Sequence, residues 1–294
     1  MGAEHFCVLD EVQAPVDAGR WRGRLAGEHL ELCDWTVAPG EPRALPLDRY
    51  AECFVVPLAG ALTLAGAPAD SAGADTEPAG APGTVLERGS LAYWPAARGP
   101  ASVGGAACRY IVVGWPDGGT PAAPAAPTNA AAAAMEAPSP LSAGPGTGLV
   151  APAAPPALPS AADAAAPAGR RQGVWDVYQF DEALVPSAPG WRFFSVDGDY
   201  LTVGCSYREA PPPAREQPHS HDGEQINVPL EGRFAFTVGG HTETIAPGWA
   251  AITPRGVTHT GLHVEFPYFQ LIFATPPRGR DYAEFLRSIY RAPD

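Results

Sequence analysis

Short hydrophobic runs alternate with Gly and Pro through the C-terminal part of this chain. The runs are rich in Val, Ile, Phe and Tyr and are too short for most helices, so they predict antiparallel strands in a sandwich or barrel. The expected strands are Leu201–Tyr207, Gln225–Leu230, Arg233–Val238, His241–Ile245, Ala250–Thr253 and Phe266–Ala274. An amphipathic helix that packs on the barrel is expected after them. Its apolar residues recur at helical spacing: Tyr282, Phe285, Leu286, Ile289 and Tyr290.

The N-terminal half carries a diverged copy of this pattern. The sequence Val-Pro-Leu-x-Gly occurs at residues 56–60 and again at residues 228–232. Gly89–Pro95 and Gly248–Pro254 form a second pair of similar segments. Repeated units of this kind predict a duplicated domain. We therefore expect an all-β protein with one domain in residues 1–118 and another in residues 171–294.

Residues 119–170 differ in composition from both halves. They are nearly all Ala, Pro, Gly and Ser, with no aromatic residue and few charges. Frequent prolines disfavour a helix, and side chains this small cannot form a core. The segment is predicted to be a disordered, partly polyproline linker.

The charge of the chain limits its partners. The net charge is −13 and no basic stripe is present, so neither nucleic acid nor an anionic membrane is an expected partner. No uninterrupted apolar stretch is long enough for a transmembrane helix, and the acidic start of the chain is unlike a signal peptide. The five cysteines are scattered and odd in number, which favours reduced thiols in a cytoplasmic protein.

Three histidines and a glutamine form the strongest candidate for chemistry. His219 and His221 are two residues apart, so on a strand both imidazoles point to the same face. A short turn then brings Gln225 beside them on the next strand, and His259 follows a later turn. Three imidazoles and an amide oxygen that converge inside a barrel predict a site for one divalent metal ion.

The spacing of these residues resembles the two conserved motifs of the cupin superfamily. The first motif, HxH followed by a ligand and a glycine, is matched by His219, His221, Gln225 and Gly232. The second, a glycine followed by PxG and a histidine, is matched by Gly248, Pro254, Gly256 and His259. With both halves counted, the chain resembles a bicupin, which implies two jelly-roll (double-stranded β-helix) barrels. Two departures are that Gln225 replaces the usual glutamate, and that Pro213 stands where a glycine usually opens the first motif.

The resemblance also leaves a choice between two neighbouring residues. The six-residue gap to Gly232 selects Gln225 as the ligand, and strand alternation then turns Asn227 inward and Glu224 outward. Glu224 in a shifted register is the alternative. The corresponding ligand positions of the N-terminal half hold residues that do not suit a metal site, so no metal is expected there: Leu47, Arg49, Cys53 and Pro100. That half resembles a degenerate cupin with a structural role.

Neutral ligands favour Lewis-acid chemistry. They leave the charge of a zinc, nickel, manganese or iron ion uncompensated, so it would polarise a carbonyl, enol or water strongly. The stretch around Gln225 is similar to that of small cupins that open unsaturated uronates, and cupins with a glutamine ligand include sugar-phosphate isomerases and polyketide cyclases. The expected function is therefore an isomerase, ring-opening enzyme, cyclase or lyase that acts on a small oxygenated metabolite of the sugar-acid or polyketide/phenolic type. An Fe(II) dioxygenase and a non-catalytic small-molecule binder are the alternatives.

Further site residues follow from strand alternation and residue type. His263 is the first candidate for the acid/base, because imidazole titrates near neutral pH, and Tyr207 is a second. Asn227 and Arg255 are candidates for substrate binding, although Arg255 could instead satisfy carbonyls of its turn. The two barrels are expected to form an intramolecular pair, with a homodimer as the alternative assembly.

Overall fold

The computed structural model describes most of both predicted domains. The described residues are 3–9, 22–37, 43–44, 50–66, 83–95, 101–104, 108–116, 170–172, 175–212, 215–276, 285 and 289. All of the predicted linker except its last residue, Arg170, lies outside this set, so its predicted disorder stays a prediction.

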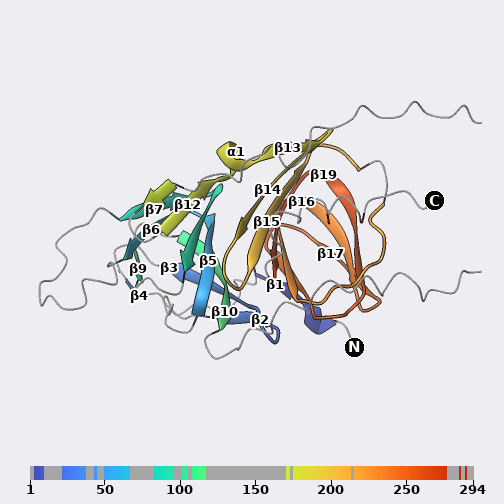
Figure 1. The fold of residues 1–294 in the computed structure, drawn as a ribbon, viewed down its shortest axis with the longest axis horizontal. Coiled ribbons are helices and arrows are strands. Elements are labelled where there is room, and N and C mark those ends of the chain that lie inside the picture. The colour runs from blue at the N-terminus through green and yellow to red at the C-terminus, as the bar shows by residue number, and fades with distance from the viewer. Residues whose placement is uncertain are drawn as a thin grey trace, which may run out of the picture.

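Nearly all of the described chain is β-strand, as the sequence predicts (Figure 1). The helical elements with bounds are the 3-10 turn η1 (Ala3–His5) and the short helix α1 (Phe180–Ala183). No helix among the described residues is long and apolar enough to cross a membrane. Of the predicted C-terminal helix, Phe285 and Ile289 are described, and both pack against Trp191 and Phe193.

The strands form two barrels. In the N-terminal barrel, a seven-stranded sheet has the order β11 (Arg170–Gln172), β12 (Trp175–Gln179), β8 (Ser90–Pro95), β5 (Tyr50–Ala59), β10 (Cys108–Pro116), β3 (Glu31–Val37) and β2 (Arg22–Ala26). It is accompanied by a four-stranded sheet with the order β4 (Arg43–Ala44), β9 (Ala101–Gly104), β6 (Ala61–Gly66) and β7 (Thr84–Glu87).

The C-terminal barrel is one eight-stranded sheet that folds over on itself. Its order is β1 (Phe6–Val8), β18 (Trp249–Thr253), β16 (Gln225–Val238), β19 (His259–Ala274), β15 (Thr202–Arg208), β14 (Trp191–Asp197) and β13 (Val185–Ala188), and β17 (His241–Ile245) also pairs with β16.

Gly232 explains how β16 and β19 bend. The register of the two strands shifts on both sides of it, and its φ of 73° is one that L side chains rarely adopt. A Cβ atom at Gly232 would also collide with the carbonyl oxygens of Glu265 and Pro267. The bend lets Phe234, beyond it on β16, stack on Tyr268 with ring centroids 5.2 Å apart. The glycine of the first motif is therefore required by the backbone.

The two barrels exchange their first strands. β1, at the start of the chain, pairs with β18 of the C-terminal barrel, and β12, at the start of the second half, pairs with β8 of the N-terminal barrel. β8 and β18 are the repeated Gly89–Pro95 and Gly248–Pro254 segments, so the exchange is reciprocal. The predicted boundaries at 118 and 171 divide the sequence into its repeats, but the strands pair across that division.

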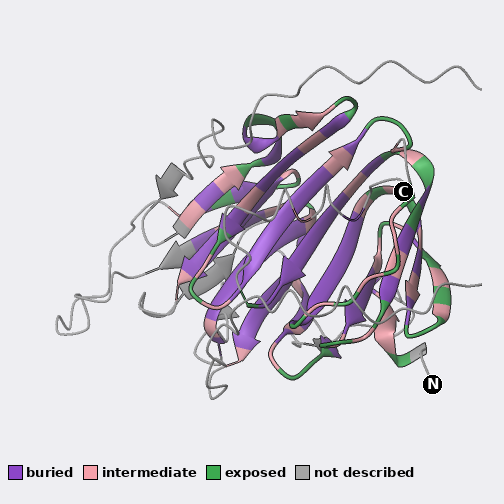
Figure 2. Cartoon of the chain, turned by 45° about the vertical axis from the view of Figure 1, so that its right-hand side comes forward, coloured by how far each residue is buried: buried purple, intermediate pink, exposed green. Residues whose placement is uncertain are grey.

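A single apolar core joins the barrels. It contains alternate residues of the central strands of both, among them Phe54 and Val56 from one barrel and Leu271 and Phe273 from the other. The rings of Phe54 and Phe273 lie 6.0 Å apart. Figure 2 shows the buried residues along these strands. Since one face of each strand serves this shared core, the opposite face lines the interior of its own barrel.

Candidate metal centre

Backbone hydrogen bonds bring the three histidines together. His219 and His259 exchange both of their backbone hydrogen bonds, with N···O distances of 3.0 and 2.8 Å. Residues paired in this way across antiparallel chains present their side chains to the same face. The backbone N–H of Gly256 donates to the carbonyl of His221 at 3.0 Å, which ties the turn before His259 to the first motif. The two motifs therefore meet at the mouth of the C-terminal barrel.

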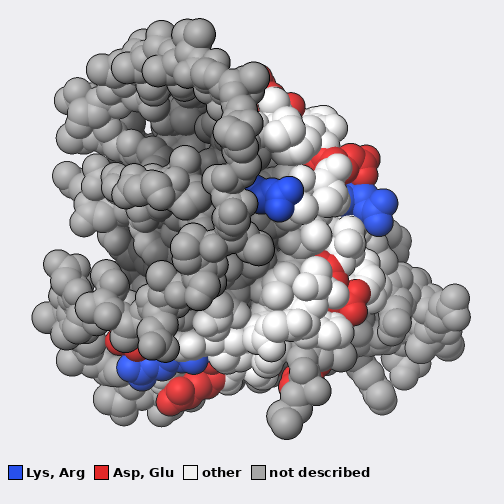
Figure 3. All heavy atoms as spheres, turned by 90° about the vertical axis from the view of Figure 1, so that its right-hand side faces the viewer, with Lys and Arg blue, Asp and Glu red and all other residues white. Residues whose placement is uncertain are grey.

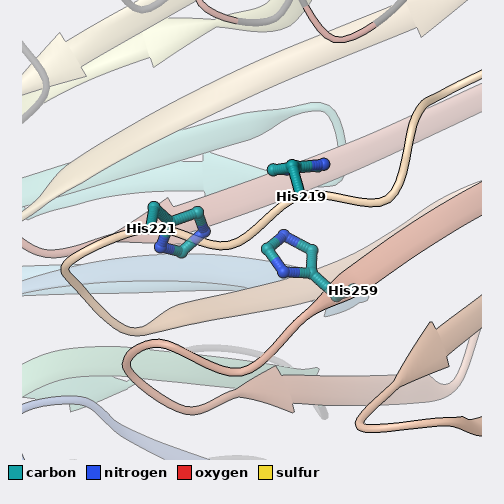
Figure 4. Close-up of side chains that lie close together, drawn as sticks. All are labelled: His219, His221 and His259. Atoms are coloured by element: carbon teal, nitrogen blue, oxygen red, sulfur yellow. The ribbon is translucent and has the colours of Figure 1, made fainter. Parts of the chain in front are cut away.

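The imidazoles face one another. The ring centroids of His219 and His259 lie 4.2 Å apart, and those of His221 and His259 lie 4.9 Å apart. One nitrogen from each of the three rings lies within 4.8 Å of the others, and Figure 4 shows the three side chains close together. His259 is buried and the other two are half-buried. Three nitrogens at this separation fit the coordination sphere of a single ion.

Backbone carbonyls fix which nitrogen each ring presents. The Nδ1 atoms of His219, His221 and His259 lie 2.9, 2.9 and 3.2 Å from the carbonyl oxygens of Gln217, Gly223 and Val257. A carbonyl oxygen only accepts, so each Nδ1 must carry the proton and each Nε2 must offer a lone pair. Metal-binding histidines are usually oriented in this way by an outer partner. The donor set therefore fits a divalent metal ion.

A buried carboxylate lies behind the cluster. Glu216 Oε1 is 3.8 Å from His219 Nδ1, and the Glu216 side chain is 7% exposed. It approaches His219 at Nδ1, the nitrogen that faces a backbone carbonyl, so it is an outer partner of the ring.

Gln225 enters the same barrel with its amide already oriented. It is the first residue of β16 and pairs with Thr253 on β18 and Ala274 on β19. Its Nε2 donates to Asn227 Oδ1 at 3.4 Å. With the amide nitrogen held there, Oε1 is the atom of Gln225 available to a metal ion. The hydrogen bond to Asn227 Oδ1 is what assigns the nitrogen and the oxygen of the Gln225 amide to their positions.

The sequence is similar to a known protein family, and the fold is similar to known structures. Residues 207–264 match the family described as a cupin domain. The whole fold is similar to that of a cupin 2 conserved barrel domain protein from Leptotrichia buccalis, with a TM-score of 0.53, 10% identity, and coverage of 92% of this chain and 95% of that one. The C-terminal barrel therefore contains a cupin domain.

Two further solved structures have a similar fold. A deletion mutant of Bacillus subtilis oxalate decarboxylase matches with a TM-score of 0.53 and 12% identity over 92% of this chain and 76% of that one. A protein named as glyoxylate-induced, from Pseudomonas aeruginosa, matches with a TM-score of 0.52 and 11% identity over 87% of this chain and 78% of that one. Among curated proteins, none matches the sequence. These identities support the two-barrel cupin fold alone.

Glu224 is directed away from the cupin interior, as strand alternation predicts. Its carboxylate accepts hydrogen bonds from backbone N–H groups of the N-terminal barrel, at residues 28–30. It is 2% exposed and so committed to the contact between the barrels. The structure thus favours Gln225 over Glu224 as the fourth donor.

His263 lies inside the barrel, but in the neutral state. Burial and, to a smaller extent, the positive charge of Arg208 together lower the pKa of His263 to about 3. The ring contacts Phe234 and Tyr268, with centroid distances of 4.8 and 4.7 Å. A base this weak is poorly matched to proton transfer near pH 7. The ring is better suited to orient a ligand by hydrogen bonding than to the acid/base role predicted for it.

Tyr207 and Arg255 are not brought to the interior. Tyr207 packs against the shared core between the barrels, under the guanidinium of Arg192. The neighbouring residue of β15, Arg208, faces inward instead. Arg255 is exposed and its Nη2 lies 3.4 Å from Asp222 Oδ1. The predicted role of Tyr207 is therefore corrected by the alternation of β15, and Arg255 forms a surface ion pair beside the two histidine turns.

Arg208 is an inward-facing residue that the sequence did not single out. It is buried, pairs with Tyr268 and Trp191 on the inner face, and stacks its guanidinium 4.6 Å from the Trp191 ring centroid. Strand alternation does show that Tyr207 and Arg208 face opposite sides of β15. The sequence gives no residue of β15 whose direction is known, so it does not show which of the two faces inward.

The N-terminal cupin has no comparable donor set among its described residues. Cys53 is fully buried among apolar and aromatic side chains of its barrel, and burial raises the pKa of its thiol, so it stays protonated. The other predicted positions, Leu47, Arg49 and Pro100, lie outside the described residues. Its interior is a packed core where the structure describes it.

Proposed function

We propose that this cupin is a metal-dependent enzyme that acts on a small oxygenated carboxylic acid by isomerase, ring-opening, cyclase or lyase chemistry. The convergence of three imidazoles carries the proposal, because one nitrogen of each ring lies within 4.8 Å of the others while each Nδ1 faces a backbone carbonyl. His219, His221, His259 and Gln225 would hold one zinc, nickel, manganese or iron ion. When bound, that ion would act as a Lewis acid toward oxygens of the substrate. The four donors are all neutral, so its charge would be offset only by the outer carboxylate of Glu216.

The interior supports an acidic substrate. Arg208 is a cation inside the barrel, and a planar guanidinium suits two-point recognition of a carboxylate. Asn227 is 2% exposed and its Nδ2 makes no hydrogen bond among the described residues, which leaves donors for a ligand. The names of two similar structures, oxalate decarboxylase and a glyoxylate-induced protein, also refer to small oxygenated acids. Arg208 and Asn227 are therefore the proposed substrate-binding residues of the barrel interior.

Surface charge agrees with a small-molecule ligand. On the face shown in Figure 3, the basic side chains of the described residues lie singly or beside acidic ones and do not gather in a patch. The net charge of −13 also disfavours a polyanionic partner.

Metal analysis combined with an anaerobic substrate screen tests the function. The full chain would be purified, its metal content measured, and small hydroxy-, oxo- and uronic acids screened for turnover without oxygen. Stoichiometric metal with anaerobic turnover is expected. Iron with substrate-dependent oxygen consumption would replace the proposal with the dioxygenase alternative. Absence of stoichiometric metal with retained ligand binding would replace it with the non-catalytic one.

The variant Gln225→Glu tests whether the neutral charge of the ligand set matters for turnover. Glutamate keeps the oxygen donor but adds a negative charge, so metal content should be kept while turnover falls by about 10-fold. Steady-state rates and metal content of the variant would be measured together. Unchanged turnover at full metal content would contradict the argument.

A further inference from the structure

Glu224 and Glu52 occupy equivalent places in the two repeats and make the same contact in opposite directions. The Glu224 carboxylate accepts hydrogen bonds from the backbone N–H groups of Glu28, His29 and Leu30, with N···O distances of 2.5, 2.6 and 2.8 Å. These residues lie in the hairpin between β2 and β3 of the N-terminal barrel.

Glu52 repeats the contact from the N-terminal barrel. Its carboxylate accepts from the backbone N–H groups of Asp199, Tyr200 and Leu201 at 2.7, 2.9 and 2.6 Å. That hairpin joins β14 and β15 of the C-terminal barrel. We call these contacts the Glu224 clamp and the Glu52 clamp.

Each clamp requires a glycine in the hairpin that it grips. A Cβ atom on Gly27 would overlap the Glu224 carboxylate, and one on Gly198 would overlap that of Glu52. The two hairpins are closed alike, since Gly27 N donates to Leu30 O at 2.8 Å and Gly198 N donates to Leu201 O at 2.9 Å. The chain therefore contains two copies of one backbone interaction, and the Glu52 carboxylate accepts a further hydrogen bond from the Tyr93 hydroxyl at 3.0 Å.

The clamps differ in what lies beside them. Glu224 stands between two groups of the candidate metal centre: the carbonyl of Gly223 accepts from His221 Nδ1, and Gln225 is the proposed fourth donor. The carbonyl of Glu224 itself accepts from Thr275 N at 3.0 Å. Glu224, in the middle of this segment, is thus held both by its backbone carbonyl and by its side-chain carboxylate. Glu52 is followed by Cys53, which lies in the apolar interior of its barrel.

We propose that Glu224 is a positioning residue for the metal centre, through which the N-terminal barrel sets the placement of His221 and Gln225. Its carboxylate points away from the site and binds no metal ion. It fixes the backbone at the start of β16. This holds the Gly223 carbonyl, which orients His221, and the Cα atom of Gln225, the proposed fourth donor. Outer partners that orient metal ligands commonly affect metal affinity by about 10–100-fold. The inference rests on the proposed metal site.

Titration of the full chain with Co²⁺ tests this role, because visible absorption reports both affinity and ligand geometry. Glu224→Gln places an amide NH₂ against three N–H donors and should break the clamp. We expect Co²⁺ affinity to fall by about 10-fold or more, with altered d–d bands. Glu52→Gln breaks the matched clamp and should lower thermal stability similarly, while Co²⁺ affinity stays within about 2-fold of wild type.

A second pair of variants acts from the opposite side of each clamp. Gly27→Ala displaces the Glu224 carboxylate but leaves every donor of the C-terminal barrel in place, so a loss of affinity there cannot come from a removed ligand. It should weaken Co²⁺ binding as Glu224→Gln does, and Gly198→Ala should not. This pair also decides the question if Glu224→Gln fails to fold.

The outcomes separate this inference from the proposed function. A wild-type chain that does not bind Co²⁺ would overturn the metal site, and the positioning role with it. Binding by wild type, with equal losses in the Glu224 and Glu52 variants or with no loss in Glu224→Gln and Gly27→Ala, would overturn the positioning role alone.

Discussion

The two barrels place different residues at equivalent inward positions. Where the C-terminal barrel has Gln225, Asn227, Thr253 and Gln270, the repeat and the strand register put Cys53, Val55, Trp94 and Tyr110 in the N-terminal barrel. The second set is fully or almost fully buried in an apolar cluster. A few inward side chains therefore decide whether a barrel of this fold has a polar interior that can receive a ligand or an interior filled by a packed core.

The largest expected difference between the barrels is in metal binding. His259→Ala removes one of three imidazoles and should weaken metal binding by more than about 100-fold, beyond what loss of an outer partner costs. Cys53→Ala, at the position equivalent to Gln225, should leave the metal content unchanged. Measurement of the metal content of both variants after dialysis checks these predictions. Loss of metal from Cys53→Ala would indicate a metal site in the N-terminal barrel and contradict the prediction.

The next effect concerns the core that the barrels share. Phe54→Ala removes a fully buried ring that contacts Tyr93 in its own barrel and Phe273 in the other. The free energy of unfolding should fall by about 3–5 kcal/mol. Because the core is common, urea denaturation should show one transition for both barrels. Two separate transitions would show that the barrels unfold independently.

A smaller effect is expected at Asn227. Asn227→Val introduces the residue type found at the equivalent position of the N-terminal barrel, Val55, and removes the acceptor of the Gln225 amide. Metal affinity should fall by about 10-fold, because Gln225 loses its orientation. Asn227→Asp keeps an acceptor oxygen and serves as the control in the same metal titration. Equal losses in both variants would argue against the orienting role.

The smallest effect is a pH dependence from His263. Its folded-state pKa of about 3 lies below the ordinary value of 6.5, so folding favours the neutral ring. The resulting stability is fully present above pH 6.5 and is lost as the pH falls toward 3. His263→Gln should therefore lose less unfolding free energy than wild type between pH 7 and pH 4, as measured by urea denaturation. Parallel curves for the two proteins would exclude His263 as the cause.

The sequence predicted the parts of this structure that depend on local spacing. His219 and His221 on one face, Gln225 rather than Glu224 facing inward, and the required Gly232 all follow from strand alternation or backbone strain. Alternation gives relative directions only. No residue of β15 has a direction known from the sequence, so alternation alone does not distinguish Tyr207 from Arg208, the residue that faces inward. The strand exchange could not be predicted, because an edge strand satisfies its hydrogen bonds equally well on either barrel.

The exchanged strands also limit how this chain can be divided. A fragment cut within the Ala/Pro-rich segment would separate β1 from β18 and β12 from β8. Each fragment would then carry a bare sheet edge together with a strand made for the other fragment, an arrangement that invites self-association. The N-terminal half, whose described residues offer no donor set, thus supplies its neighbour with an edge strand at a fixed one-to-one ratio.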